Sequence, residues 1–437
     1  MTLPPSRAAT EADQLQKLRR LLGALIPDNA FYARRLRAAG LDGELPDLDT
    51  FRRRMPRTTK QELAEDQRLH PPYGSGLTFP LENYSRFHQT SGTSGQPMSW
   101  LDTPESWAWM VSTWRRVFEA SGVTAQDRVL FPFSFGPFLG FWTAFDAAED
   151  LGCLVLAGGG LSSSARLELI RHHRVTALCL TPTYALRLGE VAAESASSDE
   201  ATGQETSSDA LASVRTLVVA GEPGGSLQST RAAIESRWPE AKVYDHHGMT
   251  EVGPVSYPNR QHPGVLHVLE SAYFAEVLDP DSGQEVGLGE EGELTLTTLG
   301  RIGSPLLRYR TGDLVKRSAS SAAELGSTDL ALEGGILTRL DDMVVVRGVN
   351  LYPAAVEEVL RTDSRVAEFR VEHRIGASLG ELQVVVEPTE QNSVDSTLAS
   401  DLTRALKDRF QLRMDVQLTP PGSLPRFEMK ARRWRSS

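Results

Sequence analysis

The pattern of hydrophobic and polar positions divides the chain into regions of different periodicity. A long amphipathic helix is predicted over residues 104–121, where large apolar side chains recur at helical spacing. Between residues 128 and 238, short apolar runs alternate with helical segments, one of them predicted over 136–151. Short buried runs between helices are typical of a parallel sheet covered on both faces. This region is therefore predicted to be α/β.

The pattern changes again further along the chain. Over about 262–340, short strands separated by glycine turns predict a β-rich subdomain. After Asp341, a new succession of strands and helices predicts a separate α+β domain of about one hundred residues. The expected fold class is thus α/β, with a large N-terminal domain (1–340) whose sheets are covered by helices, and a small mobile C-terminal lid domain (341–437). Residues 194–213, rich in Ser, Ala and Glu, are predicted to be a mobile surface insertion.

Charge and apolar content narrow the possible partners. The 437 residues carry a formal net charge of −11, which argues against nucleic acid and against an anionic membrane surface. No apolar run approaches the roughly 18 residues needed to cross a bilayer, and the N-terminus lacks the pattern of a signal peptide. A cytoplasmic enzyme is therefore expected. Cys153 and Cys179 lie in apolar runs and are interpreted as buried thiols.

One loop combines glycines with hydroxyl side chains between two predicted strands. It reads Thr90-Ser91-Gly92-Thr93-Ser94-Gly95-Gln96-Pro97. Backbone N–H groups and hydroxyls together are the donors that wrap a polyphosphate. The loop lacks the Gly-Lys-Ser/Thr ending of the familiar phosphate loop, and such a run is also common as a plain turn. The loop alone leaves both interpretations open.

Four further motifs follow in the chain. The first, Tyr244–Glu251, continues a predicted strand at the edge where open α/β sheets place ligands. The others are Tyr309–Asp313, Arg339–Asn350 and Leu424–Lys430. Each is weak alone: Glu251 and Asp313 have an alternative interpretation as helix or turn caps, and Lys430 as part of a solvated basic tail. All five motifs in this order are specific.

In this order, the motifs resemble those of the adenylate-forming superfamily of acyl-CoA synthetases, luciferases and carrier-loading adenylation domains. The length, Gly221-Glu222-Pro223 after a strand, and Leu424-Pro425-Arg426 near the end resemble its phenylacetate–CoA ligase branch. The resemblance covers about Phe51 to Arg433. It implies activation of a carboxylic acid by ATP to an acyl adenylate, followed by transfer to coenzyme A. A carrier-protein thiol or an amine as acceptor, and a non-catalytic binding protein on the same fold, are the alternatives.

The resemblance also implies roles for single residues. Residues Thr90 to Gly95 would hold the β- and γ-phosphates, and Glu251, next to Thr250, would help to place Mg²⁺. Asp313 would accept hydrogen bonds from the ribose hydroxyls, with Arg339 near the ribose or phosphate. Lys430 would neutralise charge at the α-phosphate. The remaining nucleotide-binding candidates are Gly221, Glu222, Pro223, Asp245, His246, His247, Gly248 and Met249.

Departures from the family pattern bear on these roles. Gln96 replaces a lysine, His247 replaces an aromatic tyrosine, and Met429 replaces the glycine before the terminal lysine. His246 and His247 are expected to be one core and one exposed histidine rather than a metal site, because neighbours in a strand face opposite sides. Residues 318–335 contain no cysteine, so no structural zinc is predicted.

The acid pocket is predicted from a cluster of aromatic residues. Phe133, Phe135 and Phe138 lie on either side of Gly136, and alternation at Phe131, Phe133 and Phe135 places one face of a predicted strand against a common wall. Half or more of the aromatic residues in this stretch are expected to be ordinary core. The rest would line a flat apolar slot that suits an aryl or arylacetic acid. The hinge between the domains is predicted at Asp341. The oligomeric state is left open, with a homodimer as one alternative.

Overall fold

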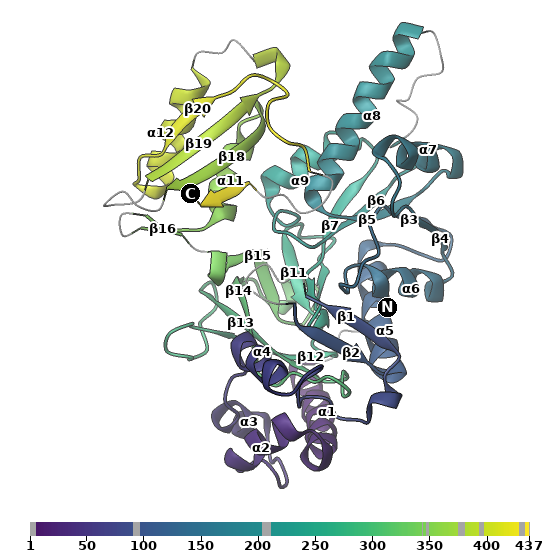
Figure 1. Cartoon of the computed structure of the whole chain (residues 1–437), viewed down its shortest axis with the longest axis vertical. Helices are drawn as coiled ribbons and strands as arrows, with labels where there is room; N and C mark the ends of the chain where they lie inside the picture. Colours follow the sequence, from purple (N-terminus) through teal and green to yellow (C-terminus); the bar gives the residue numbers. More distant parts are fainter. Residues whose placement is uncertain are drawn as a thin grey trace.

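The computed structural model describes residues 6–90, 97–202, 211–342, 344–346, 349–374, 381–392, 397–427 and 433–436 (Figure 1). The chain begins with the helices α1 (Arg7–Asp28), α2 (Ala30–Ala38), α3 (Leu48–Arg54) and α4 (Lys60–Leu69). Asn29 separates α1 from α2, because its side chain accepts a hydrogen bond from the N–H of Tyr32 and so caps the second helix. These helices pack at one end of the molecule.

A parallel sheet follows, as the alternating pattern predicts. Its order is β4-β3-β5-β6-β7. The strands are β3 (Arg128–Phe131), β4 (Leu154–Ala157), β5 (Ala177–Leu180), β6 (Thr216–Val219) and β7 (Lys242–Asp245). The helices that accompany it are α5 (Pro104–Ser121), α6 (Trp142–Leu151), α7 (Ser163–His173), α8 (Pro182–Thr202) and α9 (Gln228–Glu235). One face packs with α7, α8 and α9, and the other joins the core formed by α5 and the N-terminal helices.

Two predictions for this region are wrong in detail. The helix predicted over 136–151 begins only at Trp142, because Pro137 and two glycines precede it and Gly140 has a φ of +43°. The segment that precedes α6 is therefore a loop. The insertion predicted from residue 194 is helical as far as Thr202, where α8 ends. Alanine and glutamate, which favour helices, are frequent in that stretch. Residues 203–210 lie outside the described part.

A six-stranded antiparallel sheet forms the predicted β-rich region. Its order is β10-β11-β15-β14-β13-β12. The strands are β10 (Ser256–Pro258), β11 (Val265–Val268), β12 (Tyr273–Leu278), β13 (Glu291–Thr298), β14 (Tyr309–Arg317) and β15 (Ala331–Arg339), with the short helix α10 (Ala322–Leu325) before β15. Asp313 on β14 lies opposite Arg339 on β15. Two hairpins, β1 (Arg86–Gln89) with β2 (Ser99–Asp102) and β8 (Gly248–Met249) with β9 (Gly253–Pro254), lie nearby.

A small α+β domain with a core of its own completes the chain. Its main sheet has the order β20-β19-β18-β21. The elements after β15 are η3 (Leu340–Asp342), β16 (Val344–Val346), β17 (Val349–Leu351), α11 (Pro353–Thr362), β18 (Val366–Arg374), β19 (Glu381–Pro388), α12 (Leu398–Phe410), β20 (Asp415–Leu418) and β21 (Trp434–Ser436). This domain stands beside α8 and α9 (Figure 1). The predicted fold class is confirmed.

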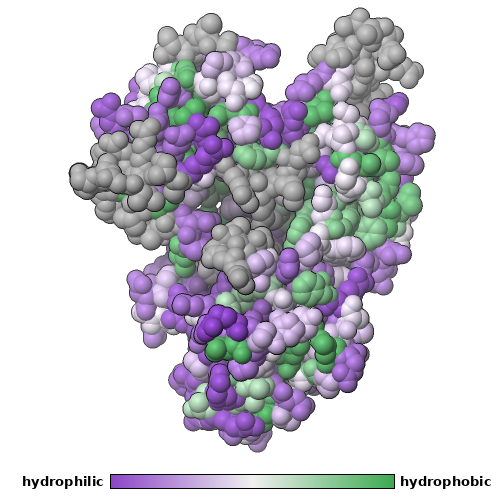
Figure 2. Space-filling view, in the orientation of Figure 1, coloured by the Kyte–Doolittle hydropathy of each residue, from purple (hydrophilic) through white to green (hydrophobic). Residues whose placement is uncertain are grey.

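Hydrophilic and hydrophobic residues are interspersed over the coloured part of the surface (Figure 2). Leu154, at the edge strand β4 of the parallel sheet, is 58% exposed and is among the few large apolar side chains at the surface. In the described part of the chain, no helix is both long and apolar enough to cross a bilayer. Cys153 and Cys179 are buried thiols, as predicted.

Candidate functional site

The hairpin of β1 and β2 carries the glycine-rich loop. Thr90 closes the hairpin, because its N–H donates to the Met98 carbonyl at 3.0 Å and its Oγ1 accepts from the Met98 N–H at 3.0 Å. Gln89 donates to the Pro137 carbonyl, which brings the aromatic loop after β3 against this hairpin. Residues Ser91 to Gly95, and Gln96, lie outside the described residues, so their phosphate-binding role stays a prediction.

The segment after β7 lies at the carboxyl edge of the parallel sheet, as predicted. Glu251 is 4% exposed, and its Oε1 accepts a hydrogen bond from the Tyr309 hydroxyl at 3.0 Å. Burial, together with the Glu251 carboxylate, raises the pKa of Tyr309 well above its usual value, so the phenol stays a donor. Gly248 allows a close approach of chains, since a Cβ there would meet the Gly253 carbonyl at 2.9 Å. The Glu251 carboxylate is therefore held from one side.

A fully buried arginine fixes the backbone of this segment. Arg301 is 0% exposed and donates to both carboxylate oxygens of Asp102, each at 2.7 Å. Its Nη1 donates to the carbonyls of Thr250 at 2.9 Å and Glu251 at 2.7 Å. Asp102 ends β2, so one guanidinium joins the glycine-loop hairpin to the segment that carries Glu251. Arg301 and Asp102 could not be predicted from the sequence, because 199 residues separate them and no local pattern links them.

Asp313 occupies the centre of a charged cluster. It is 3% exposed; its Oδ1 accepts from Arg339 Nη1 at 3.3 Å, and its Oδ2 lies 2.9 Å from His247 Nε2. Burial acts to raise the pKa of Asp313, but His247 and Arg339 outweigh it and hold the pKa below its usual value. Gly312, with a φ of +75°, leaves room for the Arg339 guanidinium, which a Cβ would meet at 3.1 Å. The cluster holds Asp313 ionised.

Unused hydrogen-bonding atoms remain in this cluster. Asp313 Oδ2 and His247 Nδ1 are buried, and neither has a hydrogen-bond partner among the residues that the structure describes. The 2.9 Å ion-pair contact of Oδ2 with His247 thus lacks good hydrogen-bond geometry. Buried acceptors without a partner are rare and costly in proteins. A ribose hydroxyl is a donor that would satisfy Oδ2, so the residues present fit a nucleotide.

The two histidines are not one core and one exposed residue. His246 is buried: its Nδ1 contacts the Ser256 carbonyl at 2.7 Å, its ring lies 4.1 Å from the Trp114 ring, and burial lowers its pKa to about 3. His247 is not exposed either, because its side chain is only 11% exposed. It turns toward β14 rather than to solvent, because the chain leaves the sheet after Asp245. Within the described residues, no group of three or more His, Cys, Asp or Glu side chains could hold a metal.

The further residues predicted to bind the nucleotide lie near the ends of β6 and β7. Asp245 accepts hydrogen bonds from the Ser226 hydroxyl at 2.6 Å and from the His246 N–H at 3.0 Å, and burial raises its pKa. Glu222 accepts from the Thr183 N–H at 2.7 Å near the start of α8. Gly221 and Pro223 on either side of it are exposed. Both carboxylates therefore have structural partners, and their contact with adenine stays a prediction.

The aromatic candidates for the acid pocket form one cluster. The Phe133 ring lies 5.3 Å from Phe138 and 5.9 Å from Phe135, each nearly perpendicular. A Cβ on Gly136 would meet the Phe138 ring at 2.7 Å. Phe133 also contacts Phe141, and the Phe141 ring contacts Trp114, which in turn contacts His246. The loop after β3 and the segment that carries Glu251 are thus neighbours.

The predicted hinge residue is tied to the charged cluster. Asp341 Oδ1 accepts from Arg339 Nε at 2.8 Å, and Asp313 and Asp341, against the effect of burial, raise the pKa of Arg339. The small domain contacts the large one near α8, where Arg433 Nη1 donates to Thr183 Oγ1 at 3.5 Å. Lys430 and Met429, like Arg347 and Gly348, lie outside the described residues.

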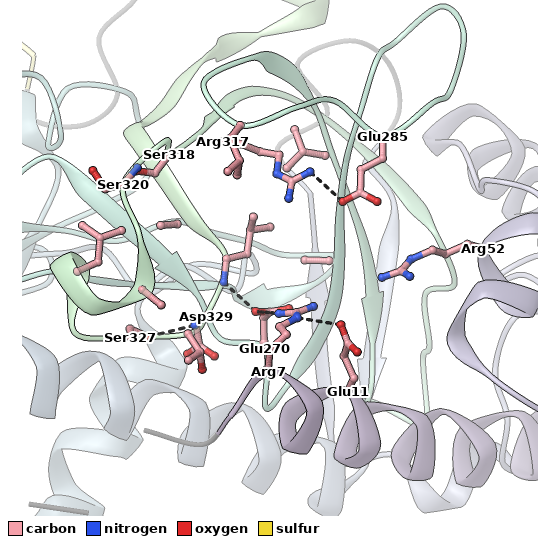
Figure 3. Close-up of a pocket in the computed structure, with 18 residues that line it drawn as sticks. Arg7, Glu11, Arg52, Glu270, Glu285, Arg317, Ser318, Ser320, Ser327 and Asp329 are labelled. Carbon is pink, nitrogen blue, oxygen red and sulfur yellow. Dashed lines mark hydrogen bonds and ion pairs between the residues drawn. The ribbon is translucent and has the colours of Figure 1, made fainter. Parts of the chain in front are cut away.

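A cavity of about 400 Å³ lies elsewhere, between the start of α1 and the segment 318–331 (Figure 3). Its guanidinium groups are already paired, Arg7 with Glu270 at 2.5 Å and Arg317 with Glu285 at 2.9 Å. None of the predicted site residues lines it. It is therefore separate from the cluster around Asp313.

Comparison with known proteins places the chain in a family. The family model for AMP-binding enzymes matches residues 86–300, and the model for the AMP-binding enzyme C-terminal domain matches residues 348–435. The phenylacetate-coenzyme A ligase of Escherichia coli (strain K12) is 30% identical, over 96% of this chain and 93% of its own. The chain belongs to the AMP-binding enzyme family. The corresponding ligase of Thermus thermophilus is also 30% identical, over 98% of this chain and 96% of its own.

The likeness to known ligases extends to the fold, as solved structures show. A 2-hydroxyisobutyryl-CoA ligase in the postadenylation state, in complex with 2-HIB-AMP, has a TM-score of 0.86 and 26% identity, covering 100% of this chain and 91% of its own. The same ligase in the thioesterification state has a TM-score of 0.68 and 26% identity, covering 99% and 91%. Our AMP-binding enzyme thus agrees better with the postadenylation arrangement.

Proposed function

We propose that this AMP-binding enzyme ligates an aryl or arylacetic acid to coenzyme A. AMP-forming acid–thiol ligation is the reaction class of its family, with ATP, Mg²⁺ and coenzyme A as the small molecules used. In the first step a carboxylate oxygen attacks the α-phosphorus of ATP, and the bond to pyrophosphate breaks. In the second step the thiol attacks the acyl carbon, and AMP leaves.

One observation carries the proposal: a buried, ionised carboxylate on β14 keeps an oxygen that accepts no hydrogen bond from the described residues, and it faces the segment that follows the parallel strand β7. Asp313 has this property, and it lies on the same strand, β14, as Tyr309, whose hydroxyl donates to Glu251. We assign Asp313 to the ribose hydroxyls, because a carboxylate can accept two hydrogen bonds from a diol. Arg339, bound to Asp313, would then lie next to the ribose or the α-phosphate.

Glu251 is the residue proposed to hold Mg²⁺. Tyr309 occupies Oε1, which orients the carboxylate, and Arg301 fixes the backbone of Glu251 and Thr250. Carboxylate oxygen is the ligand type that Mg²⁺ prefers. When bound, the ion would offset negative charge on the phosphates of ATP. Thr250 would be positioned beside them by the same buried guanidinium.

The aromatic loop after β3 supports the choice of acid. Phe133, Phe135 and Phe138 are half-buried, unlike Phe131 and Phe141, which are fully packed in the core. Half-buried rings next to the hairpin of the glycine loop offer apolar area to a bound acid. Gly136, between them, lets the Phe138 ring pack directly against the backbone, where a Cβ would meet it at 2.7 Å. These features favour a flat apolar acid over a small polar one.

The direct test is formation of acyl-CoA from a panel of acids. Purified enzyme, ATP, Mg²⁺ and coenzyme A would be incubated with phenylacetate, benzoate, acetate and malonate, and the thioesters measured by mass spectrometry. We expect the two aromatic acids to react with a higher kcat/KM than acetate or malonate. Preference for acetate or malonate would contradict the assignment of the pocket. Thioester formed only on an acyl carrier protein would identify a carrier thiol as the acceptor.

The cellular and oligomeric assignments are also proposals. We propose a cytoplasmic enzyme, in keeping with the use of intracellular ATP and coenzyme A. A homodimer remains a prediction, and its measurement is the molar mass in solution. Neither affects the assignment of the reaction.

A further inference from the structure

His247 is held so that its imidazole faces Asp313. Its N–H donates to Ser256 Oγ at 2.9 Å, and its carbonyl accepts from the N–H groups of Val255 at 2.9 Å and Ser256 at 3.2 Å. Three backbone hydrogen bonds thus fix this residue against the strand β10 and the residue before it. The side chain is 11% exposed and its Nε2 lies 2.9 Å from Asp313 Oδ2.

Asp313 is consequently held from opposite sides by different elements. Arg339 on β15 contacts Oδ1 at 3.3 Å, and His247, after β7, contacts Oδ2 at 2.9 Å. The terminal torsion of an aspartate is soft and roughly two-fold, so one contact alone leaves the carboxylate plane free to rotate. Two contacts on different oxygens fix that plane. Arg339 also forms an ion pair with Asp341. Its guanidinium is therefore not available to Asp313 alone.

We propose that His247 is a positioning residue for the nucleotide ribose, acting through Asp313. The inference rests on the proposed function, in which the Asp313 carboxylate receives the ribose hydroxyls. Recognition of a diol by two hydrogen bonds requires a fixed carboxylate plane, since hydrogen bonds weaken steeply with misalignment. His247 supplies the second of the two contacts that fix the plane. The resemblance does not supply this role, because the family pattern has a tyrosine at this position and His247 is a departure from it.

The role predicts a selective effect on hydroxyl recognition. A variant that frees the carboxylate should weaken binding of ATP but not of 2′,3′-dideoxy-ATP, which has no ribose hydroxyls to offer. A general disturbance of the site would weaken both nucleotides alike. The ratio of the two dissociation constants therefore separates positioning of Asp313 from a purely structural contribution.

The experiment measures both dissociation constants by calorimetry on the full chain. His247→Leu removes the polar contact, and His247→Gln retains an N–H donor at about the place of Nε2. We expect the preference for ATP over the dideoxy nucleotide to fall by about tenfold in His247→Leu, because the variant loses the close polar contact that holds Asp313 Oδ2 and thereby weakens a hydrogen bond between the carboxylate and the ribose. It should stay within about threefold of wild type in His247→Gln, which keeps a polar N–H group facing Asp313 Oδ2. Asp313→Asn should lose the preference, and His247→Leu added to it should cause no further loss, since coupled residues are non-additive.

Two results with His247→Leu would overturn the inference. If His247→Leu keeps the preference, or weakens both nucleotides equally, His247 does not position Asp313. If His247→Leu is unfolded in a thermal melt, the folded His247→Gln and a His247→Asn variant, whose shorter amide cannot reach, provide the same comparison. Failure of the wild-type protein to bind either nucleotide would instead contradict the proposed function itself.

Discussion

Single residues of the site are fixed by contacts that cross between elements. Arg301 satisfies Asp102 and two carbonyls of the Glu251 segment with one buried guanidinium. Asp313 is held by Arg339 and His247. Removing one partner of such a buried charged group leaves the other unpaired, which costs about 3–5 kcal/mol in typical proteins. The same contacts that stabilise the fold therefore also orient the carboxylates of the site.

The sharpest prediction for one side chain concerns Lys430. Its ammonium is proposed to neutralise charge that develops at the α-phosphate during adenylation. Lys430→Ala should slow adenylate formation by about 10²–10³-fold, as removal of one stabilising donor typically does. The same variant, given a preformed acyl adenylate and coenzyme A, should make thioester at nearly the wild-type rate. Two single-turnover assays on one protein measure the two rates.

Lys407 provides the matched control for this prediction. It is exposed on α12 and is the preceding lysine in the chain. Lys407→Ala should leave both half-reactions unchanged. Normal adenylation by Lys430→Ala would show that the terminal basic segment is only a solvated end.

The sequence predicts the carboxylates of the site but not the side chains that hold them. Glu251 and Asp313 could be singled out because they belong to motifs whose order along the chain is specific. Arg301 and Tyr309 could not be assigned to them, because the contacts join residues 50 and 58 positions apart. Such contacts leave no local spacing pattern. The prediction that one of His246 and His247 is exposed is wrong because strand alternation does not continue beyond Asp245, where β7 ends.

At the scale of elements, the loop between β14 and β15 contains a half-buried acid, Asp329, that should influence stability. Asp329 accepts from the Tyr257 hydroxyl at 2.8 Å, and its N–H donates to Ser327 Oγ at 3.2 Å. Asp329 lines the cavity shown in Figure 3. Burial raises the pKa of Asp329 from its usual 3.8 to about 6. The native state therefore binds a proton more tightly than the unfolded chain does.

This raised pKa predicts the sign of a pH dependence. Between about pH 4 and 6 the native protein holds a proton at Asp329 that the unfolded chain has lost, so the contribution of Asp329 to stability falls as the pH rises. A difference of about two pKa units corresponds to roughly 3 kcal/mol. Asp329→Asn should remove this slope, measured as the free energy of unfolding by denaturant at several pH values.

An exposed acid serves as the control. Asp281→Asn, at an exposed turn position, should keep the wild-type slope. A wild-type slope in Asp329→Asn as well would show that the carboxyl group does not titrate between those pH values.

Element-level expectations succeeded where periodicity is strong and failed where chain breakers lie close together. The helix α5 has the predicted bounds, residues 104–121, because a threonine cap, a proline in its first turn and a terminal glycine mark its ends. The helix predicted over 136–151 begins six residues later, at Trp142. Gly136, Pro137 and Gly140 keep the preceding segment in a loop, in which the aromatic rings pack together. That loop is where the candidate acid pocket lies, so the failure coincides with a functional segment.

At the scale of the whole molecule, the placement of the small domain is the main feature. Arg433 reaches Thr183 of the large domain while it is anchored to Glu368 and Glu357 in its own domain. The higher TM-score with a ligase in the postadenylation state than in the thioesterification state, 0.86 against 0.68, agrees with this placement. We propose that the small domain rotates about Asp341 between the two steps.

Asp341→Pro should separate the two half-reactions. Proline fixes φ at the proposed hinge, so adenylation should remain largely intact while thioester formation slows. The side chain of Asp341 also binds Arg339 at 2.8 Å, and its loss must be distinguished from the loss of backbone freedom. Asp341→Ala removes the carboxylate but leaves φ free, and it should retain both half-reactions. If Asp341→Pro slows both half-reactions equally while Asp341→Ala slows neither, the hinge proposal is contradicted.

The central claim, that an acyl adenylate forms before any thiol reacts, has one direct measurement. Acid-dependent exchange of labelled pyrophosphate into ATP reports reversible adenylation in the absence of coenzyme A. We predict exchange that requires the aromatic acid and Mg²⁺, proceeds without coenzyme A, and is about 10²–10³-fold slower in Lys430→Ala. Formation of ADP and phosphate, or exchange that appears only when coenzyme A is present, would contradict the account.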